Sequence, residues 1–182
     1  MNLRVIRAVV STEAADETHQ ARLLLLLSAA GSRGDGSVGG ITKLAKIDFL
    51  VRYPGYFERL LRDTRKRVPT VIMRDFERDT VESRMIRFRY GPWDPRYRRW
   101  LGLLVARGLV KTWLKGRTVN VAITPAGERV GAAIAEQPEF NDLSQRCEQV
   151  VASVGSWSGT KLKDQVYASV PELVGKAWGE AI

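Results

Sequence analysis

Apolar and polar positions along this chain follow two periods, and together they predict a mainly helical protein with a small amount of strand. Apolar residues recur at helical spacing in several segments separated by Gly, Pro or polar runs. The predicted helices cover 12–30, 41–53, 56–63, 95–107, 125–136, 140–154 and 160–169, with a further short helix toward Trp178. Residues 85–90 alternate apolar and basic side chains, which predicts a strand with one solvent-exposed face.

The first two helices differ in how their apolar residues are distributed. Five consecutive leucines, Leu23–Leu27, make the first helix apolar on most sides, so we expect it to lie in the core. The second helix is amphipathic, and Lys43, Lys46 and Arg52 fall largely outside its apolar stripe. His19 lies in the polar start of the first helix and is expected at the surface.

A β-hairpin is predicted between the helices at 95–107 and 125–136. Two strands, 109–114 and 118–123, flank a turn at 115–117 with a basic tip. Gly108 ends the helix before the hairpin, and Thr124 caps the helix after it with Pro125 in its first turn. Gly91–Pro95 reads as a rigid turn in which Asp94 caps the helix at 95–107.

This order of elements predicts a winged helix-turn-helix with additional N- and C-terminal helices. We expect a single domain over 1–182, with a winged-helix core at about 16–136 and a C-terminal helical extension at about 139–182. In DNA-binding proteins of this class the start of the recognition helix meets base edges, and the wing meets a phosphate or the minor groove.

Charge is concentrated in the same region. The chain has a formal net charge of +9, and residues 84–117 hold ten basic side chains against one acidic side chain, Asp94. Such clustering indicates a partner with negative charge. The predicted residues that bind nucleic acid or a partner protein are Arg87, Arg89, Arg96, Arg98, Arg99, Lys115 and Arg117. Four of these, Arg96, Arg98, Arg99 and Arg117, are expected to form one exposed face.

Composition argues against most enzyme classes. The chain has one histidine, His19, and one cysteine, Cys147, which is expected in the core of its helix. Acidic residues form no metal-binding set, and Gly155–Lys161 has the wrong spacing for a phosphate-binding loop. The glycine-rich segment 31–40 reads as a connection. We therefore expect no catalytic residues, no cofactor, no metal site and no small-molecule substrate.

No segment is predicted to enter a membrane. The longest apolar run, Leu23–Leu27, has five residues, whereas a spanning helix needs about 20. The expected location is the cytoplasm, where Cys147 would stay reduced.

Four blocks of the sequence carry a resemblance to a known family. They are ITKLAKIDFLVRYP (41–54), VESRMIRFRYGPWDPRYR (81–98), GLVKTWLKGRTVNVAITPAGERV (108–130) and WSGTKLKDQVYASVPEL (157–173). These blocks resemble the middle component of bacterial ABC-three-component anti-phage systems, to which the Lamassu systems are related. The resemblance implies a non-catalytic winged-helix subunit that joins an SMC- or Rad50-like ATPase to an effector. It leaves direct contact with double-stranded DNA open.

The alternative is a DNA-binding transcriptional regulator of the MarR or PadR kind. The winged-helix pattern and the basic cluster favour it, and the helices in 139–178 could supply a dimer interface. The break at Pro171 and the loop at Gly155–Gly159 weaken that interpretation.

Overall fold

The computed structural model describes residues 16–34, 36–64, 70–73, 86–88 and 91–171. For residues 86–88 and 91–93 it describes the backbone only. Within these residues the architecture is mainly helical, with one three-stranded antiparallel sheet and one two-stranded ribbon. The predicted class, mainly α with a small hairpin, is confirmed at this level. None of the described helices is both long and apolar enough to cross a bilayer.

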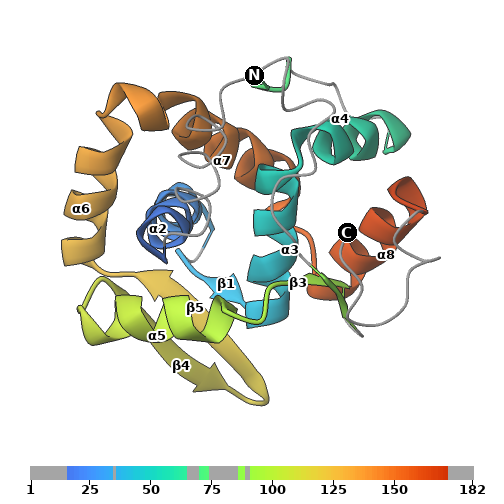
Figure 1. Ribbon diagram of the computed structural model, residues 1–182. Helices are drawn as coiled ribbons and strands as arrows, with labels where there is room; N and C mark the ends of the chain where they lie inside the picture. The colour runs from blue at the N-terminus through green and yellow to red at the C-terminus, as the bar shows by residue number, and fades with distance from the viewer. Residues whose placement is uncertain (1–15, 35, 65–69, 74–85, 89–90, 172–182) are drawn as a thin grey trace, which may run out of the picture.

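Helix α2 (Asp16–Gly31) runs through the middle of the molecule. Four other helices surround it in Figure 1: α3 (Ile41–Arg52), α5 (Tyr97–Ala106), α6 (Pro125–Ala135) and α7 (Asn141–Val154). Its five leucines, Leu23–Leu27, are each at most 4% exposed. A helix with leucine on every side is stable in water only where neighbours cover every side, so the predicted central position is confirmed.

The three-stranded sheet closes one side of this core. Strands β1 (Val38–Gly39), β5 (Thr118–Ile123) and β4 (Val110–Lys115) lie in that order, and both pairings are antiparallel. Val38 lies opposite Val121, and Val110 lies opposite Ile123; all four side chains are buried. The predicted hairpin is confirmed, whereas β1 falls in the segment that was expected to be only a connection.

The hairpin turns through two residues, Gly116 and Arg117, because Lys115 pairs with Thr118. Gly116 has a φ of 61°, in the left-handed region that tight hairpin turns require and that glycine adopts without strain. The basic tip predicted at 115–117 is therefore the turn between the two strands.

The ribbon corrects one prediction. Strand β2 (Ile86–Phe88) lies within the predicted strand 85–90, but Gly91–Trp93, expected to be part of a rigid turn, forms strand β3 and pairs with it. Pro92 is tolerated because each strand of a two-stranded ribbon has one edge that needs no N–H donor. Strand β3 packs against α3, which places Asp94 beside that helix.

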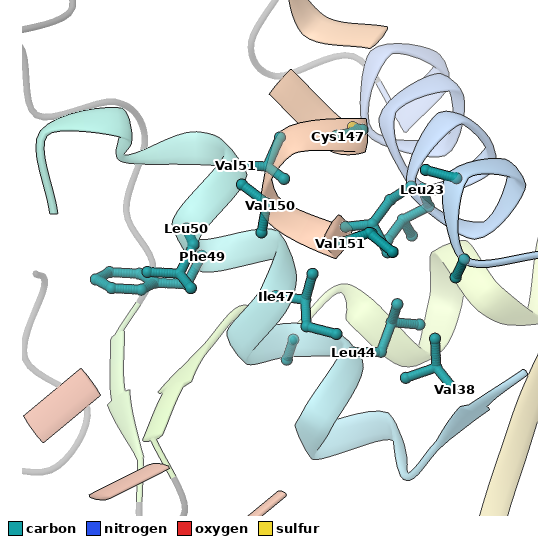
Figure 2. Close-up of a cluster of buried hydrophobic side chains, with 14 of the residues drawn as sticks. Leu23, Val38, Leu44, Ile47, Phe49, Leu50, Val51, Cys147, Val150 and Val151 are labelled. Carbon is teal, nitrogen blue, oxygen red and sulfur yellow. The ribbon is translucent and has the colours of Figure 1, made fainter. Parts of the chain in front are cut away.

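Helix α3 corrects a second prediction. Its apolar residues Leu44, Ile47 and Leu50 are buried as expected, and Figure 2 shows them with side chains contributed by α2 and α7. Lys46 and Arg52, predicted to lie largely outside the apolar stripe, are each only 3% exposed. The reason is that α8 and the ribbon cover the sides of α3 that its own periodicity would leave to solvent.

The remaining helices extend the same core. Helix α4 (Pro54–Asp63) follows α3 directly, and a 3₁₀ turn (Pro138–Phe140) leads into α7. Helix α8 (Gly159–Ser169) is capped at its N-terminus by Ser158, whose hydroxyl accepts a hydrogen bond from the Lys161 N–H. Cys147 on α7 is fully buried, as predicted, and Leu162 and Val166 of α8 join the same cluster. The predicted helix beyond Pro171 lies outside the described residues.

The first turn of α6 packs against Gly108 and Leu109, the two residues before strand β4. The Thr124 hydroxyl accepts from the Gly127 N–H (3.1 Å) and donates to the Gly108 carbonyl (2.7 Å), so the predicted cap is confirmed. The Thr124 N–H donates to the Leu109 carbonyl. This close approach leaves no space at Gly127, where a Cβ atom would collide with the Leu109 carbonyl oxygen and with Ile123.

We expect Gly127→Ala to lower the free energy of unfolding by about 1–3 kcal/mol, because backbone must move to admit the methyl group. Gly102→Ala is the matched control: Gly102 is exposed in the middle of α5 with open space around its Cβ position. That change should raise stability by about 0.5–1 kcal/mol. Urea unfolding measures both, and an unchanged midpoint for Gly127→Ala would contradict the packing described.

Candidate nucleic-acid interface

Helix α5 is positioned by a chain of buried charges. Asp48, fully buried in α3, accepts a hydrogen bond from Arg22 Nε of α2 (2.6 Å), and its other oxygen lies 2.9 Å from Arg52 Nε. Arg52 Nη1 continues the chain to Asp94 Oδ2 (3.3 Å), in the segment leading to α5. The Arg96 guanidinium closes it with a 2.9 Å bond to the same Asp94 oxygen. Two carboxylates and three guanidiniums thus join α2, α3 and the start of α5.

The charges in this cluster stabilise one another's ionised forms. Burial would raise the pKa of Asp48, but the guanidiniums of Arg22 and Arg52 outweigh it and hold the pKa below its ordinary value. The pKa of Asp94 is also lowered, since hydrogen bonds from the side chain and backbone of Arg96 outweigh its burial. Both carboxylates are therefore charged at neutral pH, and removing either takes away negative charge that balances the buried guanidinium of Arg52.

Trp100 locks the first turn of α5 onto α2. Its side chain is fully buried, and its indole Nε1–H donates to Asp16 Oδ1 (2.8 Å). His19 of α2 stacks on the indole with ring centroids 4.1 Å apart. The guanidiniums of Arg96 and Arg52 lie 4.9 Å and 5.5 Å from the centre of the Trp100 ring, within the range of cation–π attraction. The tryptophan thus fixes α5 to the rest of the core.

His19 was wrongly predicted to be a surface residue. It is 2% exposed, and neither ring nitrogen has a hydrogen-bond partner among the described residues. The pKa of His19 is lowered from 6.5 to about 3, mainly by burial and then by the charges of Arg22, Arg52 and Arg96, which outweigh the opposite effect of Asp48. The imidazole is therefore neutral and acts as a flat ring packed against Trp100.

The basic residues on and around α5, most of them predicted to bind a partner, fall into two groups. Three of the arginines on this helix and its flanks bond to neighbours: Arg96 to Asp94, Arg99 to Asp16 (2.7 Å) and Arg107 to Gln20 (2.7 Å). The Arg96 side chain is 38% exposed and the Arg99 side chain 70% exposed. Arg96 therefore faces the buried cluster more than the solvent.

The second group faces outward. Arg98 on α5 and Lys115 and Arg117 at the hairpin tip are exposed, and none makes a hydrogen bond or ion pair with the described residues. Lys111 on β4 is also exposed, with its ammonium 5.9 Å from the centre of the Trp113 ring. Between Pro95 and Gly127 the sequence has seven basic and no acidic residues. The side chains of Arg87 and Arg89 lie outside the described part of the chain.

The buried cluster that orients this surface is not predicted by the sequence pattern. One signal was present: Asp48 stands between Leu44 and Val51 on the apolar stripe of α3, where a carboxylate must be buried with a cation. Its partner Arg22 lies 26 residues earlier and Asp94 lies 46 residues later, so no local pattern identifies either.

Elsewhere in the described residues we find few groups suited to catalysis or metal binding. No group of three His, Cys, Asp or Glu side chains is placed to hold a metal ion. Burial raises the pKa of the Cys147 thiol to about 12, so its reactive thiolate form is suppressed. A cavity of about 420 Å³ opens between α2, α3 and α7, where Lys43 Nζ donates to the Gly155 carbonyl (2.7 Å). Its lining has serine hydroxyls but no histidine or carboxylate beside them.

Comparison of the chain with protein-family models, with curated proteins and with solved structures found no match.

His19 predicts how stability depends on pH. Its folded pKa is lowered, so as pH falls below 6.5 the unfolded chain binds a proton that the folded chain does not. Its contribution is fully present above pH 6.5 and is lost as pH falls toward 3. We expect the free energy of unfolding to fall by about 2 kcal/mol from pH 7 to pH 5. In His19→Phe, which keeps a ring on Trp100, urea unfolding should show little change over that interval; an equal loss would contradict the assignment.

Asp48→Asn should lower the free energy of unfolding by about 3–5 kcal/mol, because it removes the buried negative charge shared by Arg22 and Arg52 and leaves Asp94 as the carboxylate paired with Arg52. Arg99→Ala, which removes an exposed ion pair, should cost less than about 1 kcal/mol and serves as the control. Urea denaturation at pH 7 compares them. Equal small effects would mean that the buried cluster contributes no more than a surface pair.

Proposed function

We propose that this chain is a winged-helix module that binds double-stranded nucleic acid through α5 and the β4–β5 hairpin. The order of its elements supports this: α2, β1 and α3 precede α5, the hairpin follows α5, and the strands lie in the order β1-β5-β4. Helix α4 and the β2–β3 ribbon are inserted between α3 and α5. In this proposal α5 is the recognition helix and the hairpin is the wing.

One observation carries the proposal: the outward cations lie on both of those elements. Arg98 is exposed on α5, and Lys115 and Arg117 are exposed at the hairpin tip. No acidic residue occurs between Pro95 and Gly127 to neutralise them. Phosphate contacts of this kind supply most of the affinity of a protein for duplex DNA and orient it on the backbone.

The exposed side of α5 is also small enough to enter a groove. Gly102 and Ala106 are exposed, and Gly102 has open space where a side chain would project. Glycine in the interior of a helix costs about 0.5–1 kcal/mol relative to alanine, and no contact of the described residues explains it here. A close approach of this helix to base edges in the major groove provides a reason.

A second proposal concerns the setting of the module. The four sequence blocks resembling the middle component of ABC-three-component systems favour an accessory subunit between an SMC- or Rad50-like ATPase and an effector. Exposed apolar side chains on the hairpin, Trp113 and Leu114, agree with a protein partner. Co-purification of the tagged protein with the products of adjacent genes tests this, and recovery of only a free monomer or homodimer would count against it.

A regulator of the MarR or PadR kind is the alternative. It predicts a sequence-specific mobility shift on the promoter of its own gene, whereas the accessory subunit predicts binding that is indifferent to sequence.

The nucleic-acid proposal is tested with a double variant, Arg98→Glu with Arg117→Glu. Fluorescence anisotropy of a labelled 20-base-pair duplex in 100 mM salt should show at least a tenfold loss of affinity. The matched control is Arg62→Glu on α4, at the opposite end of the molecule from α5 in Figure 1, which should change affinity less than twofold.

Salt dependence provides a second readout of the same contacts. Three phosphate contacts predict a log–log slope of affinity against salt of about −3, and the double variant should flatten that slope. The double variant makes two charge reversals and the control makes one. A loss in the Arg62→Glu control that reaches half of the loss in the double variant, on a logarithmic scale, would show that only net charge matters and would overturn the proposed interface.

A further inference from the structure

Strand β4 is an edge of the three-stranded sheet. Its inner side pairs with β5 over six residues, and no strand pairs with its outer side in the described residues. The Gly40 N–H donates to the Val119 carbonyl, so the backbone of Val119 faces β1. Leu114 lies opposite Val119 and must face away from β5, and Thr112, two residues earlier, faces the same way. Both residues therefore present outward an N–H and a C=O that bond to no other residue in the described part of the chain.

The side chains along this edge are unusually apolar for an open strand. Leu114 is 71% exposed and Trp113 is 41% exposed. Lys111, Trp113 and Lys115 alternate along β4 and so project from one side of the sheet, with the Lys111 ammonium near the Trp113 ring. Lysine commonly protects an open edge from pairing, but a tryptophan and a leucine between the lysines offer a contact surface instead.

We propose that the β4 edge accepts an extended segment of a partner protein as an additional strand, and that every second residue of this segment follows the order acidic, apolar, acidic. The outward groups of Thr112 and Leu114 would bond its backbone. Its acidic side chains would lie opposite Lys111 and Lys115, and its apolar side chains would cover Trp113 and Leu114.

Charge complementarity favours an acidic partner segment over a second copy of this chain at the β4 edge. Residues 95–127 carry seven cations and no acid, so two copies joined at β4 would bring like charges together across the interface. An acidic segment instead brings opposite charge to Lys111 and Lys115 on this strand. The inference goes beyond nucleic-acid binding, because it uses the backbone edge of β4 and does not require Arg98 or α5.

The probe is a labelled synthetic peptide with the pattern Glu-Val-Ile-Thr-Glu-Val, and its binding to the full chain is measured by fluorescence anisotropy. We expect binding that slows hydrogen exchange at the Thr112 and Leu114 amides. A peptide with Lys in place of Glu should bind at least about tenfold more weakly. No binding at millimolar peptide, or protection confined to other amides, would overturn the proposal.

Two variants separate the edge from the rest of the surface. Thr112→Pro removes an outward N–H without removing a bond to β5, so peptide affinity should fall about tenfold while duplex binding is unchanged. Thr112→Val keeps that N–H and should bind like the wild type. In Lys111→Glu with Lys115→Glu the preference should reverse toward the Lys peptide, which also shows that the strand is still formed.

The same kind of measurement also detects a different partner at the β4 edge. A dimer in sedimentation velocity that Thr112→Pro dissociates would assign the edge to a second copy and overturn the acidic partner. Protection of the Thr112 and Leu114 amides by duplex DNA in place of the peptide would assign it to nucleic acid. Loss of duplex binding in Arg98→Glu with unchanged peptide binding would leave this inference intact, so the two proposals fail separately.

Discussion

The buried carboxylate of Asp48 is the contact on which the arrangement of this molecule depends. Hydrophobic packing brings α2, α3 and α7 together, but it has no direction and tolerates several relative orientations. Bonds from Arg22 and contacts with Arg52 do have direction, and Arg52 passes the constraint to Asp94 at the start of α5. A charge in such a setting is strongly destabilising when unpaired, so these helices are held to one orientation.

That constraint also determines which cations are available to a partner. Arg96, Arg99 and Arg107 are drawn toward α2 and the segment before α5, where Asp94, Asp16 and Gln20 accept their hydrogen bonds. Arg98, on the other side of the same helix, meets none of these groups and faces solvent with the hairpin tip. The basic residues form one block in the sequence, but the structure divides them into two sets. The inward arginines hold α5 in place, and the outward cations can bind a negatively charged partner.

The tip and the outer edge of the hairpin present different groups to a partner. Its tip presents cations beyond the sheet, whereas its edge presents unpaired backbone beside Trp113 and Leu114. Burial of Val110, Val121 and Ile123 fixes the register, and with it which backbone groups of β4 point outward. A one-residue slip would bury lysine and expose the valines, so the core enforces both surfaces.

Much of the fold was readable from neighbours in the chain. The leucine run, the alternation around Gly116 and the cap at Thr124 each act within a few residues, and each predicted its element. The burial of His19, Lys46 and Arg52, the pairing of β1 and β3, and the division of the arginines depend on groups from different elements of the chain meeting in space. Periodicity reports which side of a helix is apolar. It cannot report what covers the other side, because an ion pair between distant residues leaves no local pattern.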